Sequence, residues 1–328
     1  MAKIAITDGM EKKAIALFEK SGHEIMNQSF THQELLDGAL DDVEAIVVRS
    51  ATKLTKEVIQ ANSSNLKVIA RAGVGVDNID LQAAGMAGIY VVNAPQASTQ
   101  SVVELTIGHL FASIRHVPRA HEGMKQGRWE KKQMKGSELN GKSLGLIGFG
   151  RIAQGVSRVA QAIGMEVHAY DPYVPERIAK AEHARLHKTV ESLFSSCTHI
   201  SVHCNLTEET HHLVNQDMIR LMPQIGTDGT ACGNHIVNCA RGGIVDEESA
   251  FRSLQSGELT SLALDVFETE PVDASLPLLQ HPHFHGTPHI GASTLEAQLR
   301  VGLSIVDSVL DILNDKECDF VVNRSFLE

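Results

Sequence analysis

The chain has 328 residues, of which 43% are hydrophobic and 21% charged, and its formal net charge is -11. This length predicts about two domains, and this composition allows a sizeable core without long disordered tracts. The negative charge argues against nucleic acid or an anionic membrane surface as the main partner.

The chain begins with "MAKIAITDGM", which lacks the apolar core of a signal peptide, and no segment reaches the roughly 18 apolar residues of a membrane span. We therefore expect a cytoplasmic protein that does not enter a membrane. Short β-branched runs then alternate with helical segments; the runs are "KIAIT", "AIVVRS", "LKVIARAG" and "YVVNAP". This repetition predicts parallel strands joined by helical crossovers.

A long helix is predicted next, with Ser98 or Thr99 as its N-cap. A second α/β series follows, with the runs "SLGLIGFG", "EVHAYD", "HISVHC", "HIVNCA" and "LALDVF", and then another long amphipathic helix. Two helices that bracket one of two α/β units indicate that the second unit is inserted into the first. We predict two Rossmann-like or flavodoxin-like parallel-sheet domains: residues 1–97 with 291–328 for the substrate, and residues 98–290 for a nucleotide.

A glycine-rich turn opens the second series. In "GLIGFGRIAQ", Gly148 permits a tight turn and Gly150 lets the backbone approach a pyrophosphate at the start of the next helix. The next strand ends at Asp171, where a carboxylate would accept hydrogen bonds from the adenosine ribose and repel a 2′-phosphate. The pattern predicts a site for NAD in preference to NADP, and its alternative is a glycine-rich loop in an unrelated α/β fold.

Three polar side chains follow later strands: Arg241 after "HIVNCA", Glu270 after "LALDVF" and His289 in "GTPHIGAST". The carboxyl ends of parallel strands share one edge of the sheet, so we expect these side chains to converge. A histidine can take a hydroxyl proton as hydride leaves an alcohol, a carboxylate can orient the ring, and an arginine can hold a substrate carboxylate. Taken singly, each could instead be a surface ion pair or an incidental histidine.

The stretch "HPHFHGTPH" raises the question of a metal site, because His283 and His285 would share one face of a strand. No carboxylate or cysteine stands beside them at ligand spacing, and hydride transfer to NAD requires no metal, so we expect none. The five cysteines show no CxxC spacing and are odd in number, which argues against a zinc knuckle and a disulfide framework.

Motifs along nearly the whole chain resemble the D-isomer-specific 2-hydroxyacid dehydrogenases, among them "RAGVGVDNIDLQAA", "LNGKSLGLIGFGRI", "VNCARGGIVDE", "ALDVFETEP" and "PHIGAST". The resemblance implies two α/β domains around a cleft and a catalytic set of Arg241, Glu270 and His289. It also implies that Asp265 binds the nicotinamide carboxamide of NAD. The other residues that it places at NAD are Arg151, Ile152, Asp171, Cys204, Cys239, Ala240, Gly291 and Ala292.

Two arginines bear on the substrate. Arg49 and Arg71 end two strands of the first domain, and Gly73 follows in the same predicted site. A bare 2-hydroxy acid needs one carboxylate clamp, so two further arginines indicate a second anionic group such as a phosphate, unless they pair with surface acids. The resemblance adds Lys131 of "RWEKKQM", contributed by a neighbouring subunit.

We therefore expect NAD-dependent oxidation of 3-phospho-D-glycerate to 3-phosphohydroxypyruvate, the entry step to serine, by a homodimer. One alternative is a hydroxypyruvate or glyoxylate reductase, or a dehydrogenase of another doubly anionic acid such as a sulfolactate. Another is an NAD-sensing interaction protein of the corepressor type. Some members of the family carry a serine-binding regulatory domain, and we expect no feedback inhibition through such a domain.

One segment departs from the family pattern. The stretch "PQIGTDGTACGN", residues 223–234, is longer than the usual turn. It enters at the amino end of a predicted strand, so we expect it to lie away from the active site.

Overall fold

The computed structural model describes residues 1–327 and divides the chain into two compact units. Unit 1 consists of Met1–Ser98 and the segment from Ala292 onward, and unit 2 is Thr99–Gly291. The predicted boundaries lie one residue from these positions. Within the described residues, neither unit has a helix whose length and apolar character would suit a bilayer crossing.

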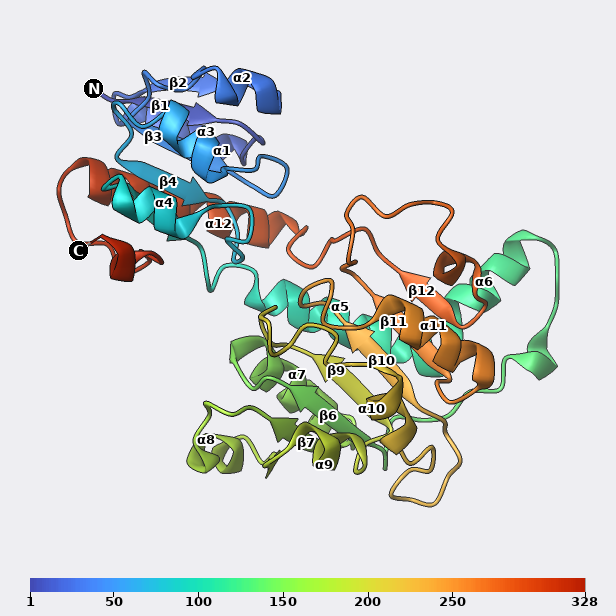
Figure 1. Ribbon diagram of the computed structural model, residues 1–328. Coiled ribbons are helices and arrows are strands. Elements are labelled where there is room, and N and C mark those ends of the chain that lie inside the picture. The colour runs from blue at the N-terminus through green and yellow to red at the C-terminus, as the bar shows by residue number, and fades with distance from the viewer. Residues whose placement is uncertain (328) are drawn as a thin grey trace. The chain divides into compact units, whose positions relative to one another are not determined.

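Unit 1 is a parallel sheet with helices on both faces (Figure 1). Its strands are β1 (Lys3–Ile6), β2 (Glu24–Asn27), β3 (Ala45–Val48), β4 (Val68–Arg71) and β5 (Tyr90–Asn93). Its helices are α1 (Lys12–Lys20), α2 (His32–Leu36), α3 (Lys56–Ala61), α4 (Leu81–Met86) and α12 (Leu295–Leu313), followed by the 3₁₀ turn η3 (Arg324–Phe326). The spatial order β2-β1-β3-β4-β5 is that of flavodoxin-like folds.

The two faces of this sheet follow from the alternation of side chains along each strand. In β1, Ile4 and Ile6 pack in a core cluster that includes Phe18 of α1 and Ile305 of α12. Ala5, between them, belongs to the opposite cluster, which is closed by α2, α3 and α4. Because both faces are covered, β1, β3 and β4 consist almost entirely of buried apolar residues.

Unit 2 is a larger sheet of the same kind (Figure 1). Its strands are β6 (Ser143–Ile147), β7 (Glu166–Tyr170), β8 (Arg185–His187), β9 (His199–Val202), β10 (His235–Asn238), β11 (Ser261–Leu264) and β12 (Phe284–Gly286). Its helices are α5 (Thr99–Ile114), α6 (Val117–Lys125), α7 (Arg151–Ala162), α8 (Glu176–Ala181), α9 (Val190–Phe194), α10 (Gln216–Leu221) and α11 (Glu247–Ser256), with 3₁₀ turns η1 (Lys131–Gln133) and η2 (Pro277–Gln280).

The strand order of unit 2 fixes where a ligand can bind. The order is β12-β11-β10-β9-β6-β7-β8, and every pair is parallel. From β6 the chain runs to β7 and β8 on one side, then returns to β9 on the other side. This reversal between β6 and β9 is the topological switch point at which doubly wound sheets bind nucleotides. The predicted fold class, two parallel-sheet α/β domains, is confirmed.

The segment of residues 223–234 packs at the amino end of β6, as expected. Thr227 Oγ1 donates to the Gly141 carbonyl oxygen, and Lys142 Nζ lies 2.7 Å from Asp228 Oδ2. The Lys142 side chain is only 2% exposed, so this ion pair anchors the segment to the core of unit 2. The opposite edge of the sheet, where the strands end, is left for ligands.

Candidate active site

The glycine turn after β6 leaves room for a phosphate at the start of α7. Gly148 has φ +85°, and a Cβ there would lie 2.9 Å from the backbone of His203 and Cys204 at the end of β9. Only glycine fits that position, for both reasons. Gly150 is the N-cap of α7, and a Cβ there would meet no heavy atom within 4 Å. The open space over a helix N-terminus is suited to a pyrophosphate, so these residues fit NAD.

Asp171 is held beside the same turn. One carboxylate oxygen accepts from Phe149 N at 2.8 Å and the other from Tyr173 N at 2.9 Å. A carboxylate has about four acceptor positions, so two remain for ribose hydroxyls. The geometry therefore leaves Asp171 able to take the predicted role.

The remaining residues expected at NAD lie at the same edge of unit 2. Arg151 and Ile152 begin α7, Cys204 follows β9, and Cys239 and Ala240 follow β10. Burial raises the pKa of the Cys204 thiol to about 11 and that of Cys239 to about 12. Both are thus neutral thiols, and their contacts with NAD stay a prediction.

The predicted acid and base meet directly. His289 Nδ1 lies 2.7 Å from Glu270 Oε2, and Glu270 Oε1 accepts from Phe267 N at 3.0 Å. Since an ionised carboxylate only accepts, it keeps the proton on Nδ1 and leaves Nε2 as the basic nitrogen. His289 Nε2 makes no hydrogen bond within the described residues, and the side chain is 41% exposed. The imidazole is therefore open to a substrate.

The charge state of Glu270 follows from its surroundings. Burial raises the pKa of this carboxyl, but hydrogen bonds from His289 and Phe267 and the charges of His289 and Arg241 outweigh it, so its pKa lies below the usual value. Glu270 is ionised near neutral pH and can stabilise a protonated imidazole.

Arg241 is set by the turn that follows β10. Asn238 Nδ2 donates to the Arg241 carbonyl oxygen at 2.8 Å, and Asn238 Oδ1 accepts from Ala240 N at 2.9 Å. A Cβ at Gly242 would overlap the Phe267 carbonyl oxygen, so glycine lets this turn touch the loop that leads to Glu270. Sequence reasoning did not single out Asn238. An asparagine at a strand end, the usual residue for such a side-chain turn, was the available signal.

Asp265 has a structural task that the family resemblance did not imply. It is 1% exposed, and its oxygens accept from Thr287 Oγ1 at 2.6 Å and from Ile290 N and Gly291 N at 2.8 Å. These bonds hold the loop in which His289 adopts the left-handed region, with φ +52°. One acceptor position remains, and binding of the nicotinamide carboxamide there stays a prediction.

In unit 1, the two arginines lie at neighbouring strand ends. Val48 of β3 pairs with Arg71 of β4, so Arg49 follows directly beside it. Arg49 donates to Gln298 Oε1 of α12. The Arg71 guanidinium lies against the α-carbon of Gly73, where a Cβ would overlap it. The structure thus brings Arg49, Arg71 and Gly73 together at one edge of the sheet.

Lys131 and Ala292 are the two remaining predicted residues. Lys131 is exposed on η1, and its side chain has no hydrogen bond or ion pair within residues 1–327. Ala292 opens the second segment of unit 1, where its carbonyl oxygen accepts from Gln298 Nε2 at 2.8 Å. The structure does not by itself give either residue a ligand-binding task.

A cluster of side chains that could bind a metal ion lies outside the histidine-rich stretch "HPHFHGTPH". Ligand atoms of His212, Asp246 and Glu268 lie within 4.8 Å of one another in the described part of the chain. Each of these side chains already has a structural partner, which explains why they lie close together. His212 Nε2 lies 3.1 Å from Glu268 Oε1, and Asp246 caps α11. Sequence spacing did not indicate this group, because its members come from three separate loops.

A doubly wound nucleotide unit with an exposed, carboxylate-paired histidine at its ligand edge defines a class of protein, the nicotinamide-dependent oxidoreductases. Residues 107–291 match the family described as D-isomer specific 2-hydroxyacid dehydrogenase, NAD binding domain. The chain belongs to this family of enzymes, and its cofactor is NAD.

Three relatives each cover at least 94% of the chain. The chain is 42% identical to a D-3-phosphoglycerate dehydrogenase of Methanocaldococcus jannaschii over 98% of its own length and 60% of that protein. It is 44% identical to a hydroxypyruvate reductase of Thermotoga maritima over 94% of its length and 97% of that protein. The crystal structure of an NAD⁺-bound 3-phosphoglycerate dehydrogenase of Entamoeba histolytica is similar with a TM-score of 0.80, 29% identity and coverage of 98% and 99%. The chain thus spans about 60% of the length of the M. jannaschii relative.

Proposed function

We propose that the protein oxidises 3-phospho-D-glycerate to 3-phosphohydroxypyruvate with NAD, the entry step to serine. The observation that carries this proposal is the pair formed by His289 and Glu270, with Nδ1 and Oε2 2.7 Å apart and Nε2 open. A 2-hydroxy acid needs such a base for its hydroxyl proton, and a positive group for its carboxylate.

The residues act together as follows. His289 Nε2 takes the hydroxyl proton while the C2–H bond breaks with both electrons and the C2–O bond becomes a carbonyl. Bound NAD supplies the acceptor for that hydride. Glu270 stabilises the imidazolium that forms, and Arg241 holds the substrate carboxylate through its planar guanidinium. In the reverse direction, His289 returns the proton to the carbonyl oxygen.

The cofactor and the phosphate are assigned to separate groups of residues. Gly148, Gly150 and Asp171 would hold the pyrophosphate and the adenosine ribose of NAD. We propose that Arg49 and Arg71, with the backbone at Gly73, bind the phosphate of the substrate. Their neighbouring positions at the ends of β3 and β4 support this assignment, because two guanidinium groups can share one dianion. Lys131 of a second subunit is proposed to add charge there.

A second candidate function is reduction of hydroxypyruvate, favoured by the 44% identity to the T. maritima reductase over nearly all of that protein. Hydroxypyruvate carries one anionic group, so it would not need Arg49 and Arg71. The two functions therefore differ in what these arginines contribute to the Michaelis constant.

A substrate panel with purified protein and NAD or NADH tests the choice. For wild type, we expect the highest kcat/KM with 3-phospho-D-glycerate. In Arg49→Gln and Arg71→Gln, KM for this substrate should rise at least about tenfold, while the kinetics with glyoxylate stay unchanged. Equal kinetics of variant and wild type with 3-phospho-D-glycerate would contradict the phosphate assignment. NAD binding without turnover of any 2-hydroxy acid would instead favour a sensor of the corepressor type.

We also propose that the protein forms a homodimer through α5, α6 and the arm that follows. Several large apolar side chains are exposed along this stretch: Phe111, Val117, Met124 and Trp129. An exposed apolar surface of this kind is typical of a protein–protein contact, and two-fold homodimers are the commonest soluble oligomers.

A further inference from the structure

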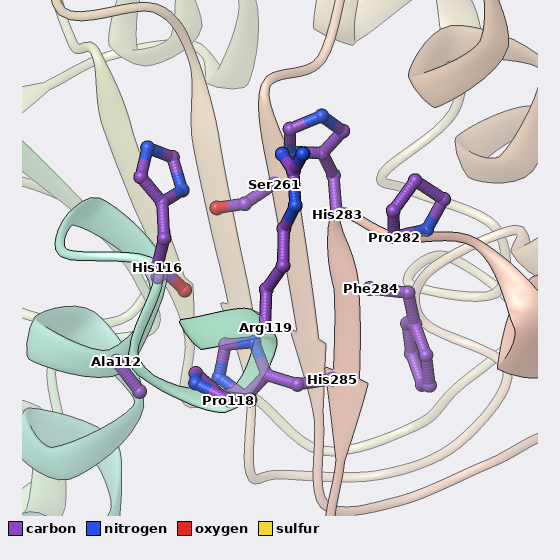
Figure 2. A pocket seen from close by; sticks show the side chains of 10 residues that line it. Ala112, His116, Pro118, Arg119, Ser261, Pro282, His283, Phe284 and His285 are labelled. Atoms are coloured by element: carbon purple, nitrogen blue, oxygen red, sulfur yellow. The ribbon is translucent and has the colours of Figure 1, made fainter. Parts of the chain in front are cut away.

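A hollow in unit 2 lies between the start of α6 and β12, apart from the residues assigned above. Ten residues line it, and none of them is acidic. Four are basic or titratable: His116, Arg119, His283 and His285. In Figure 2 the Arg119 side chain extends toward the His283 ring, with His116 on the other side. In a chain with a net charge of -11, Arg119 supplies a permanent positive charge here, and burial keeps the rings of His283 and His285 neutral, so that they can donate hydrogen bonds.

Two polar atoms at this hollow lack a partner. Ser113 Oγ and His285 Nε2 are both buried and make no hydrogen bond within the described residues. The Ser113 residue is only 3% exposed. Roughly nine in ten or more buried polar groups in folded proteins have a partner, so two orphans at one hollow point to a polar ligand. An apolar ligand would leave both unsatisfied.

The start of α6 adds to the positive field. Its N-cap, His116, gives no side-chain hydrogen bond to the helix, so the first N–H groups of the helix and its positive end stay available. Arg119 lies in the first turn, and its guanidinium has no hydrogen bond or ion pair within residues 1–327. Burial and then the Arg119 charge lower the pKa of His283. An anion would relieve this repulsion.

We propose that the hollow binds a small oxyanion of the phosphate class, held by the Arg119 guanidinium, the rings of His283 and His285, and the Ser113 hydroxyl. Two observations argue against a metal ion here: Arg119 carries a permanent positive charge, and among the described residues the ligand atoms of these histidines do not form a close group of three. This site differs from the proposed substrate site, whose arginines belong to unit 1.

The test is isothermal titration calorimetry with inorganic phosphate in saturating NAD, so that the glycine turn is occupied. The background is Arg49→Gln/Arg71→Gln, which removes the proposed substrate phosphate site. We expect one phosphate per chain to bind in this background. Adding Arg119→Gln should weaken binding at least about tenfold. Adding Arg158→Gln, which removes a surface arginine that pairs with Glu182 in the same unit, should change nothing.

Ser113→Ala provides a second variant that keeps the fold. Its hydroxyl has no hydrogen bond to lose, so the unfolding midpoint should not fall, whereas phosphate binding should weaken. The proposal is overturned if the background variant binds no phosphate at millimolar concentration. It is equally overturned if Arg119→Gln and Ser113→Ala both bind phosphate as tightly as the background. Neither result depends on which 2-hydroxy acid the enzyme oxidises.

Discussion

His289 owes its orientation to Glu270, and a nearby pair offers a matched comparison. Glu268 also binds a histidine, His212, and its side chain is 37% exposed against 36% for Glu270. Glu270→Gln should lower kcat by at least about tenfold, because the amide cannot stabilise the imidazolium. Glu268→Gln should leave kcat unchanged. Steady-state rates with NAD titrations check both, and equal losses would mean that the effect is structural.

A second prediction at the residue scale separates the two tasks of Asp265. In Asp265→Asn, an amide replaces the carboxylate that accepts from Ile290 N and Gly291 N. The amide has one acceptor oxygen in place of two, so one of these hydrogen bonds is lost. Thr287→Val removes the hydroxyl, which donates to Asp265 Oδ1 and lies 3.2 Å from His109 Nε2, and leaves both backbone N–H bonds to Asp265 in place. We expect Asp265→Asn to reduce kcat more than Thr287→Val and to speed hydrogen exchange at these two amides. Unchanged exchange with reduced NAD affinity would assign Asp265 to the carboxamide alone.

At the scale of elements, two glycines of the turn between β6 and α7 should respond differently to substitution by alanine. Gly148→Ala forces a Cβ against the backbone of His203 and Cys204, just after β9, and places alanine at a positive φ, so it should destabilise the fold and abolish NAD binding. Gly150→Ala meets no protein atom, so thermal stability should be unchanged while NAD affinity falls. Thermal unfolding and NAD titration check both variants. Unchanged NAD affinity in Gly150→Ala would place the pyrophosphate elsewhere.

The elements also show what a sequence can predict. β3, β9, β10 and β11 are fully buried, so their apolar runs indicated strands. β2 and β8 lie at sheet edges and are partly exposed, and their mixed sequences "EIMN" and "RLH" gave no such signal. The predicted ends of the parallel strands likewise indicated the edge of the sheet at which Arg241 and Glu270 lie. The hydrogen bonds from the backbone of Ile290 and Gly291 to Asp265 depend on the dihedral angles of the His289 loop. The pattern of side chains in the sequence does not predict such angles.

The segment of residues 223–234 should matter for stability and not for catalysis. The hydrogen bond from Lys142, followed by that from Thr230 N, lowers the pKa of Asp228 from 3.8 to about 2. A carboxyl whose pKa is lower in the folded chain than in the unfolded chain stabilises the fold at pH values above its unfolded-state pKa. This stabilisation is lost as the pH falls from about 4 to about 2. Asp228→Asn should lower the unfolding midpoint at pH 7 and flatten its decline in acid, with kcat unchanged. Asp217→Asn, 85% exposed, is the control.

At the scale of the whole molecule, two effects oppose each other in the proposed dimer: repulsion between the negative charges of the two chains and burial of exposed apolar side chains. Each chain carries -11, so two copies repel each other, and in the proposed homodimer the exposed apolar side chains from Phe111 to Trp129 would have to offset that repulsion. Added salt screens charge with a Debye length of about 8 Å at 0.15 M, so dimers should tighten between low and physiological salt.

Met124→Glu/Trp129→Glu places charge in the proposed contact, whose side chains are 56% and 79% exposed, and should give a monomer. Met86→Glu changes an equally exposed residue of α4 and should leave the dimer intact. Sedimentation velocity at micromolar concentration distinguishes these outcomes. A dimer that survives the double substitution would move the contact to another surface, because burying carboxylates without partners costs several kcal/mol.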